Sequence, residues 1–130
     1  MRRFIFAFMI AAPLAGAWAA NAPAPEAPTL EYNKVGKASF YSSRLHGRPT
    51  ASGIAYDQTA LTAAHPDLPF GTLVCVTNMT NQRSVQVEIN DRGPYTGGRI
   101  IDLSRRAAQE IGMINAGSVR VRVEACEAES

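Results

Sequence analysis

Hydrophobic and polar positions alternate most clearly between Val85 and Asp91, where Val85, Val87 and Ile89 occupy every second position. This period of two is typical of a strand with one buried face. The alternation stops at Asp91, because the glycine–proline pair that follows favours a turn and the proline has no N–H group for a sheet. Polar groups at the rims of β structures commonly form functional sites. Asp91 is therefore our first candidate for a functional residue.

The remaining pattern predicts further short strands separated by turns that contain glycine and proline. These strands cover residues 36–41, 72–77, 99–103 and 119–123. One helix is predicted from Arg105 to about Ile111, because Ser104 is a good N-cap and Gly112 is a natural stop. Many short strands with one short helix predict a small closed β-barrel.

Two stretches between these strands are predicted to be irregular. Residues 42–53 are polar and contain several glycines, and a loop of this length in so small a domain is usually functional. Residues 56–64 lead into His65, which is followed by a proline. A residue before proline is restricted to extended conformations, so any helical turn in this stretch must end at His65.

The N-terminus has the organisation of an export signal. Met1 and two arginines precede an apolar run from Phe4 to Ala17, and the small residues around Trp18 suit signal peptidase. We assign residues 1–20 to a signal peptide, 21–34 to a disordered linker rich in proline and alanine, 35–126 to the folded domain and 127–130 to a tail. A retained membrane anchor is the alternative. A lipid anchor is excluded at Ala17, where a cysteine would be required, so we expect a soluble periplasmic or secreted protein.

Charge and cysteine content narrow the function further. The 13 Lys and Arg residues exceed the 11 Asp and Glu residues only through Arg2 and Arg3, which the signal peptide removes, since 13 − 2 = 11. The mature chain is formally neutral and has no basic field for nucleic acid. In an oxidising compartment Cys75 and Cys126 are most simply a disulfide, with two inert thiols as the alternative. Two cysteines and two scattered histidines do not make a credible zinc site, and no cofactor is expected.

Several motifs along the chain resemble those of the rare lipoprotein A family, in the same order and at the same spacing. The likeness extends from Gly36 to Val123. It is carried by residues 36–41, 46–48, 50–53, 56–57, 62–65, 68–72, 90–94 and 98–104. This resemblance implies a mainly β fold, namely a small six-stranded double-psi β-barrel with one or two short helices.

The resemblance also implies an activity. Members of the family are endolytic lytic transglycosylases, which cleave the β-1,4 bond between N-acetylmuramic acid and N-acetylglucosamine of peptidoglycan and leave 1,6-anhydro ends. They favour glycan strands without stem peptides, and we expect this chain to act on them as a monomer. The family's polar groove corresponds to Asp57, His65 and Asp91, which we take as the catalytic residues. Ile54 stands where the family usually has glutamate, so a non-catalytic glycan-binding or wall-loosening module, like the expansin barrels, is the alternative.

Each proposed catalytic residue also has a purely structural interpretation. Asp91 could cap the turn that follows it or pair with Arg92 or Arg99. His65 could be a loop histidine whose nitrogens are satisfied by the backbone. Asp57 could form an Asx-turn. A single carboxyl group of suitable pKa can protonate the leaving oxygen and then deprotonate the 6-hydroxyl group of the sugar, so the chemistry does not require a second carboxylate.

The candidates for substrate binding are aromatic and basic residues of the same motifs. Tyr41, Tyr56 and Tyr95 could stack on sugar rings, although aromatic residues at strand ends often only pack. His46, Arg92 and Arg99 complete the predicted set of substrate-binding residues. Asp102 is expected to be structural, with its carboxylate bonded to the backbone near the start of the predicted helix.

Overall fold

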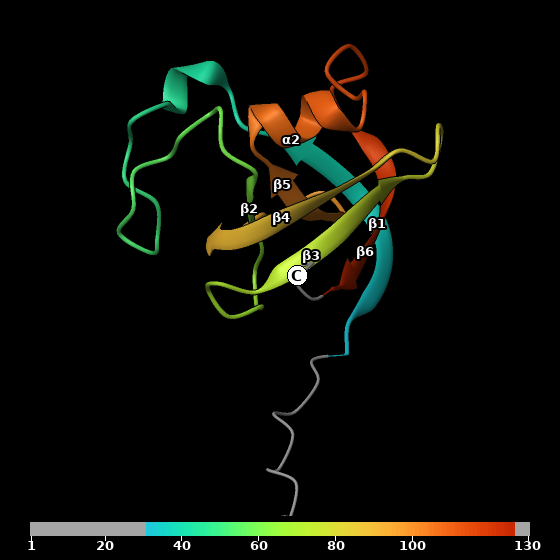
Figure 1. The fold of residues 1–130 in the computed structure, drawn as a ribbon, viewed down its shortest axis with the longest axis horizontal. Helices are drawn as coiled ribbons and strands as arrows, with labels where there is room; N and C mark the ends of the chain where they lie inside the picture. Colours follow the sequence, from blue (N-terminus) through green and yellow to red (C-terminus); the bar gives the residue numbers. More distant parts are fainter. Residues whose placement is uncertain (1–30, 127–130) are drawn as a thin grey trace, which may run out of the picture.

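The computed structural model describes residues 31–126, and within them six strands close into a barrel (Figure 1). The strand order around the barrel is β1-β5-β2-β4-β3-β6. The strands are β1 (Asn33–Phe40), β2 (Thr62–Ala64), β3 (Leu73–Asn78), β4 (Ser84–Asp91), β5 (Arg99–Leu103) and β6 (Val119–Ala125). A 3-10 helix, η1 (Ser43–Leu45), and one α-helix, α2 (Arg105–Glu110), complete the elements. The small closed barrel predicted from the sequence is confirmed.

The apolar side chains of the alternating strands fill the interior of the barrel. Val85, Val87 and Ile89 of β4 are buried, and so are the alternating valines of β3 and β6. Pairs β1–β5 and β2–β4 are parallel, whereas the other pairs are antiparallel. Each fully buried Val or Ile contributes about 1.5–3 kcal/mol to stability. A core of this kind holds the ends of non-adjacent segments in fixed positions at the barrel rim.

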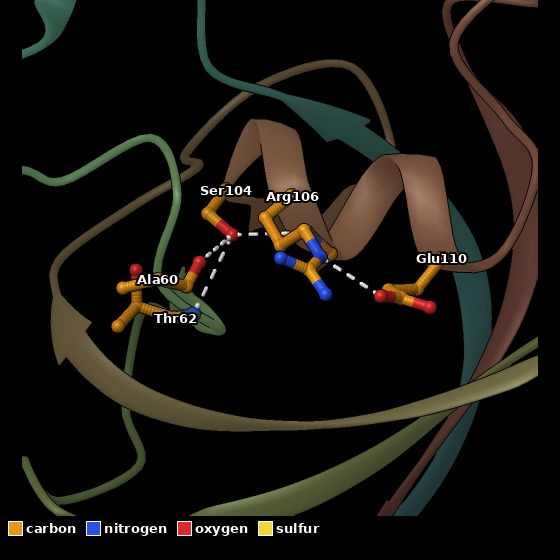
Figure 2. A network of polar contacts seen from close by, with 6 residues as sticks. Ala60, Thr62, Ser104, Arg106 and Glu110 are labelled. Atoms are coloured by element: carbon orange, nitrogen blue, oxygen red, sulfur yellow. Dashed lines mark hydrogen bonds and ion pairs between the residues drawn. The ribbon is translucent and has the colours of Figure 1, made fainter.

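Helix α2 forms as the sequence predicts and packs against β4, β1 and β5. The Ser104 hydroxyl caps it by accepting from Ala107 N at 3.2 Å. The same hydroxyl donates to Ala60 O at 2.6 Å and accepts from Thr62 N at 3.5 Å, which ties the helix to the segment before β2 (Figure 2). Ala107, Ala108 and Ile111 are buried, and Gly112 follows with a φ of +68°. Neither helix within residues 31–126 has the length and apolar composition to cross a bilayer.

Three local predictions need comment. Strand β1 begins at Asn33, so it includes two residues that the sequence analysis assigned to the linker. Thr62–Ala64 is a strand and not the end of a helical turn, because it pairs with both β4 and β5. The predicted disulfide is present between Cys75 and Cys126, whose Cα atoms lie 5.8 Å apart, and it links β3 to the residue after β6. The predicted signal peptide (1–20), most of the linker and the tail (127–130) lie outside the described residues.

Candidate active site

Strand β4 delivers Asp91 to the rim of the barrel through a β-bulge. Ala63 pairs with Ile89 and Ala64 pairs with Asp91, so Asn90 is an extra residue on β4. A bulge changes the direction of the side chains that follow it. Asn90 is buried, whereas the Asp91 side chain remains partly exposed. The bulge therefore explains how a carboxylate at the end of a buried strand reaches solvent.

The Asp91 carboxylate receives hydrogen bonds from its neighbour Arg92 and from two segments that are distant in sequence. Its Oδ1 accepts from Ala51 N at 2.8 Å and from Arg92 N at 2.9 Å, and its Oδ2 accepts from the Tyr41 hydroxyl. We call Asp91, Tyr41 and Ala51 the Asp91 cluster. The bond to Arg92 N matches the predicted turn cap, but no ion pair with Arg92 or Arg99 forms. A carboxylate can accept about four hydrogen bonds, so one acceptor position on Oδ2 has no partner among residues 31–126.

Tyr41 connects Asp91 to the loop of residues 41–61, which extends from one side of the barrel (Figure 1). Its ring stacks on Tyr56, with centroids 4.5 Å apart and an interplanar angle of 28°. Burial, and then the hydrogen bond to Asp91, raise the pKa of Tyr41 above its ordinary value. Tyr41 therefore keeps its proton at neutral pH, and its hydroxyl donates a hydrogen bond to Asp91.

Tyr56 does not have the exposure that sugar stacking requires. Only 3% of it is exposed, and its hydroxyl accepts from Arg105 N at 3.0 Å. Burial is the main cause that raises the pKa of Tyr56. The packing interpretation therefore fits Tyr56, whose ring supports Tyr41. Tyr95, in contrast, is 73% exposed beside the turn that follows Asp91, so its ring is available to a ligand.

His65 is buried, and no hydrogen bond within residues 31–126 joins its ring to the Asp91 carboxylate. It is 1% exposed. Its Nδ1 accepts from Asp67 N at 3.0 Å and from Leu68 N at 3.1 Å, so the proton of the neutral ring is on Nε2, which faces the Tyr32 hydroxyl at 2.9 Å. Burial lowers the pKa of His65. These contacts match the alternative of a histidine satisfied by the backbone and do not support a groove position. We call His65, Tyr32 and the N–H groups of residues 67 and 68 the His65 cluster.

The two arginines predicted to bind substrate have partners of their own. Arg92 Nη1 donates to His65 O at 3.1 Å and to Leu68 O at 2.8 Å, and its guanidinium lies 4.1 Å from the centre of the Phe70 ring. Arg99 Nη1 contacts Ser39 Oγ at 2.7 Å and Asp102 Oδ1 at 3.3 Å. Asp102 also accepts from the Ser39 hydroxyl, so its partners are side chains and not the backbone near the helix start as predicted.

Asp57 and His46 lie together on the loop of residues 41–61. Asp57 is exposed, and its Oδ1 accepts from Thr59 Oγ1 at 2.6 Å and from Thr59 N at 2.8 Å. The hydroxyl contact and then the backbone contact lower the pKa of Asp57, so it is ionised at neutral pH. The Asx-turn interpretation therefore fits. His46 Nδ1 accepts from Gln58 N at 3.1 Å, and its ring meets Tyr56 edge-on. No hydrogen bond or ion pair within residues 31–126 joins Asp57 to Asp91.

The sequence analysis did not predict that the turn of residues 50–54 contributes to this site. The hairpin turn of residues 50–54 supplies Ala51 N, and the Thr50 hydroxyl stabilises that turn by donating to Ile54 O at 2.6 Å. The Ile54 side chain is 61% exposed on the same turn. The motif of residues 50–53 was noted, but its backbone role was not foreseen. In residues 31–126 no group of three or more His, Cys, Asp or Glu side chains is arranged to hold a metal ion.

Comparisons with known proteins bear on this geometry. The endolytic peptidoglycan transglycosylase RlpA of Neisseria meningitidis serogroup B is 48% identical over 100 residues, which are 77% of this chain and 42% of the relative. The RlpA of Pasteurella multocida is 57% identical over 93 residues, which are 72% of this chain and 32% of the relative. The chain thus spans less than half the length of these relatives.

Solved structures share the fold at low sequence identity. The Streptomyces papain inhibitor superposes with a TM-score of 0.60 at 23% identity and covers 74% of this chain and 96% of its own. A mutant of Clavibacter michiganensis expansin, solved with cellohexaose, also gives 0.60, at 18% identity, covering 76% of this chain and 52% of its own. The model of the lytic transglycolase family matches residues 33–123, from the first strand to the last. The chain therefore belongs to the lytic transglycolase family of double-psi β-barrels.

Proposed function

We propose that this chain is an endolytic lytic transglycosylase that cleaves the β-1,4 bond between N-acetylmuramic acid and N-acetylglucosamine of peptidoglycan. The Asp91 cluster is the observation that carries this proposal. It presents a partly exposed carboxylate with one acceptor position open, held by groups from three segments. Family membership supports the same activity, since relatives that share about half of the aligned residues are named for it.

The hydrogen bonds of Asp91 support one of its two oxygens as the one that transfers the proton. Oδ1 already accepts from two backbone N–H groups, so the transferable proton belongs on Oδ2. Tyr41 faces Oδ2, and its hydroxyl can donate to the ionised oxygen and accept from the protonated one. Asp91 can therefore lose and regain a proton while it keeps the same neighbours. A proton carrier in a transglycosylase must do this in every turnover.

The reaction then balances without water. Asp91 gives its proton to the glycosidic oxygen, the bond from that oxygen to C1 of the muramic residue breaks, and N-acetylglucosamine leaves as an alcohol. The 6-hydroxyl oxygen of the muramic residue forms the new bond to C1, and its proton goes to Asp91. The product has a 1,6-anhydro end, and the carboxyl group is restored.

We further propose that the mature chain acts outside the cytoplasm, in the periplasm or after secretion, as a monomer. The support is the export signal predicted for residues 1–20 and the disulfide between Cys75 and Cys126, which suits an oxidising compartment. The relatives are named for peptidoglycan, which lies in that same compartment.

Mass spectrometry of the products tests the activity. Purified protein incubated with glycan strands should release fragments with 1,6-anhydro ends, and Asp91→Asn should abolish them. Glu88→Gln is the matched control, because it removes an exposed carboxylate of the same strand that belongs to neither the Asp91 cluster nor the His65 cluster. Fragments with reducing ends would indicate hydrolysis and contradict the proposed reaction.

A second candidate function is glycan binding without cleavage. The specific observation is Ile54, which is exposed on the same turn as Ala51 and cannot carry a proton or accept a hydrogen bond. If the family's usual glutamate at this position were essential, the chain would retain glycan strands in a pull-down and release no fragments. The mass spectrometry above separates the two functions directly.

A further inference from the structure

A pocket lined by polar residues lies where the segment after Tyr56 meets helix α2. Its volume is about 210 Å³, and it is lined by Gln58, Thr59, Arg105, Arg106 and Gln109. We propose that this pocket binds a carboxylate group of the substrate, and this inference rests on the proposed function. Neither the sequence motifs nor the predicted substrate-binding residues include these side chains.

The lining of the pocket is rich in hydrogen-bond donors. It combines two guanidinium groups, two side-chain amides and one hydroxyl, and no carboxylate is among the lining residues. Guanidinium groups bind carboxylates through paired N–H donors, which match the two oxygens in geometry. A carboxylate therefore suits this pocket better than a neutral sugar hydroxyl does.

Arg105 is the residue that we expect to bind the ligand. It is half-buried, and its guanidinium contacts no carboxylate among residues 31–126. Arg106 differs, because its Nε donates to Glu110 Oε1 at 2.8 Å (Figure 2). The other nearby carboxylate, Asp57, accepts hydrogen bonds from Thr59. Arg105 is thus the cation in the pocket that lacks an anionic partner.

The backbone of α2 does not supply the site. Arg105 N donates to the Tyr56 hydroxyl at 3.0 Å, and Arg106 N donates to Gln58 O at 3.0 Å. Ala107 N donates to the Ser104 hydroxyl at 3.2 Å. These amide groups already have partners inside the protein, so a bound carboxylate would be held by side chains.

The pocket is connected to Asp91 through two stacked rings. Tyr56, whose hydroxyl contacts Arg105 N, stacks on Tyr41 at 4.5 Å, and Tyr41 donates to Asp91. In the proposed complex, a glycan strand with its scissile bond at Asp91 presents a neighbouring group to Arg105. In peptidoglycan that carboxylate has two sources, the lactyl group of a muramic residue without a peptide or the stem peptide itself. Both present the same chemistry to the pocket.

An NMR titration of the mature chain tests the inference with three probes. N-acetylmuramic acid carries the lactyl carboxylate, muramoyl dipeptide carries peptide carboxylates, and N-acetylglucosamine carries neither. We expect one of the two acidic probes to shift the resonances of Gln58 and Arg105, and N-acetylglucosamine to leave them unchanged. Tighter binding of N-acetylmuramic acid identifies the lactyl group as the ligand, and tighter binding of muramoyl dipeptide identifies the stem peptide.

Variants of Arg105 decide whether the pocket is responsible. Arg105→Gln should weaken binding of the acidic probe about tenfold, as expected for the loss of one hydrogen bond to a charged group. Arg105→Lys keeps the charge and should recover part of the affinity, which guards against a folding defect. Arg120→Gln is the matched control, because Arg120 is exposed on β6 and outside the pocket. Equal binding of all three probes, or an unchanged affinity in Arg105→Gln, overturns the inference.

The two proposals can fail separately. Cleavage of glycan strands with an unchanged KM in Arg105→Gln would leave the transglycosylase and remove the subsite. Binding of an acidic probe that depends on Arg105, together with no cleavage by the wild-type chain, would leave the subsite and remove the proposed activity. Asp91→Asn should bind the acidic probe as the wild type does, since it leaves the pocket intact.

Discussion

The Asp91 cluster and the His65 cluster are adjacent and differ in their exposure and in their unused hydrogen-bonding capacity. The backbone joins them, since His65 N donates to Asp91 O at 3.1 Å. The Asp91 carboxylate is partly exposed and keeps an acceptor position free, whereas His65 is buried and uses both ring nitrogens inside the protein. Both residues belong to equally recognisable motifs. A motif therefore identifies a polar residue, but exposure and unused hydrogen-bonding capacity indicate whether it can meet a substrate.

His65 has a role that its contacts define. Its ring holds the N–H groups of residues 67 and 68, and the carbonyls of His65 and Leu68 in turn hold Arg92. Arg92 follows Asp91 directly and donates its own N–H to that carboxylate. We propose that His65 is a positioning residue, which acts on Asp91 through Arg92 and the backbone.

The largest expected effect is on activity, which should depend far more on Asp91 than on His65. Asp91→Asn should lower the rate at which anhydro ends form by about 10³-fold, because it removes the proton carrier. His65→Asn should lower that rate less than about tenfold, because the amide oxygen can replace Nδ1 as the acceptor for the loop. Quantitative mass spectrometry of the products measures both rates. Equal losses of rate in the two variants would instead indicate that His65 is a catalytic residue.

The effects on stability should have the opposite order, with a larger loss from a substitution of His65 than from one of Asp91. His65→Ala leaves the N–H groups of Asp67 and Leu68 without their acceptor, the second of them buried, and creates a cavity. The free energy of unfolding should therefore fall by about 2–4 kcal/mol. Asp91→Asn keeps an oxygen for the same backbone donors and should cost about 1 kcal/mol or less. Urea unfolding followed by circular dichroism gives both values. A His65→Ala variant as stable as the wild type would contradict the positioning role.

Tyr41→Phe tests the partner of Asp91 with a smaller change. The ring and its stacking on Tyr56 remain, but the hydroxyl that faces Oδ2 is lost. We expect kcat to fall about tenfold with little change in KM, since one hydrogen bond to a charged group is removed. Thr77→Val is the control, because it removes a hydroxyl that contacts Ser84 Oγ between β3 and β4, outside the Asp91 cluster. A pure rise in KM would assign Tyr41 to substrate binding instead.

The pH dependence of stability should report on the His65 cluster. Burial lowers the pKa of His65 below its ordinary value of 6.5, so the unfolded chain binds a proton at a higher pH than the folded chain does. The contribution of His65 is therefore complete above about pH 6.5 and is lost as the pH falls through the folded pKa. Thermal unfolding between pH 7.5 and 5 should show this loss, and His65→Asn should flatten it. An equal slope in both proteins would place the titrating group elsewhere.

The smallest effect is expected at the edge of the Asp91 cluster. Ile54→Glu introduces the glutamate that the family resemblance implies at this position. The site is 61% exposed, however, so solvent screens the charge of the new carboxylate. We expect the rate to rise no more than about threefold. Product analysis on one batch of glycan strands compares the two proteins. Activity that appears only in Ile54→Glu would favour the binding function for the natural chain.

Much of the fold follows from local sequence. The alternation of β4, the Ser104 cap and the Gly112 stop are properties of neighbouring residues, and each of them was predicted correctly. The position of Asp91 at a strand end was predictable for the same reason. The start of β1 and the strand at Thr62–Ala64 were missed, because both depend on pairing with distant strands.

The sequence by itself determined which polar groups are present, where strands begin to alternate and where turns interrupt them. Only the tertiary structure decided what those groups do. Tyr41 and Ala51 reach Asp91 across 50 and 40 positions of the chain, and Tyr32 reaches His65 across 33. Hydrogen bonding and exposure depend on which segments the closed barrel brings together, and this arrangement comes from the whole core and not from any single motif.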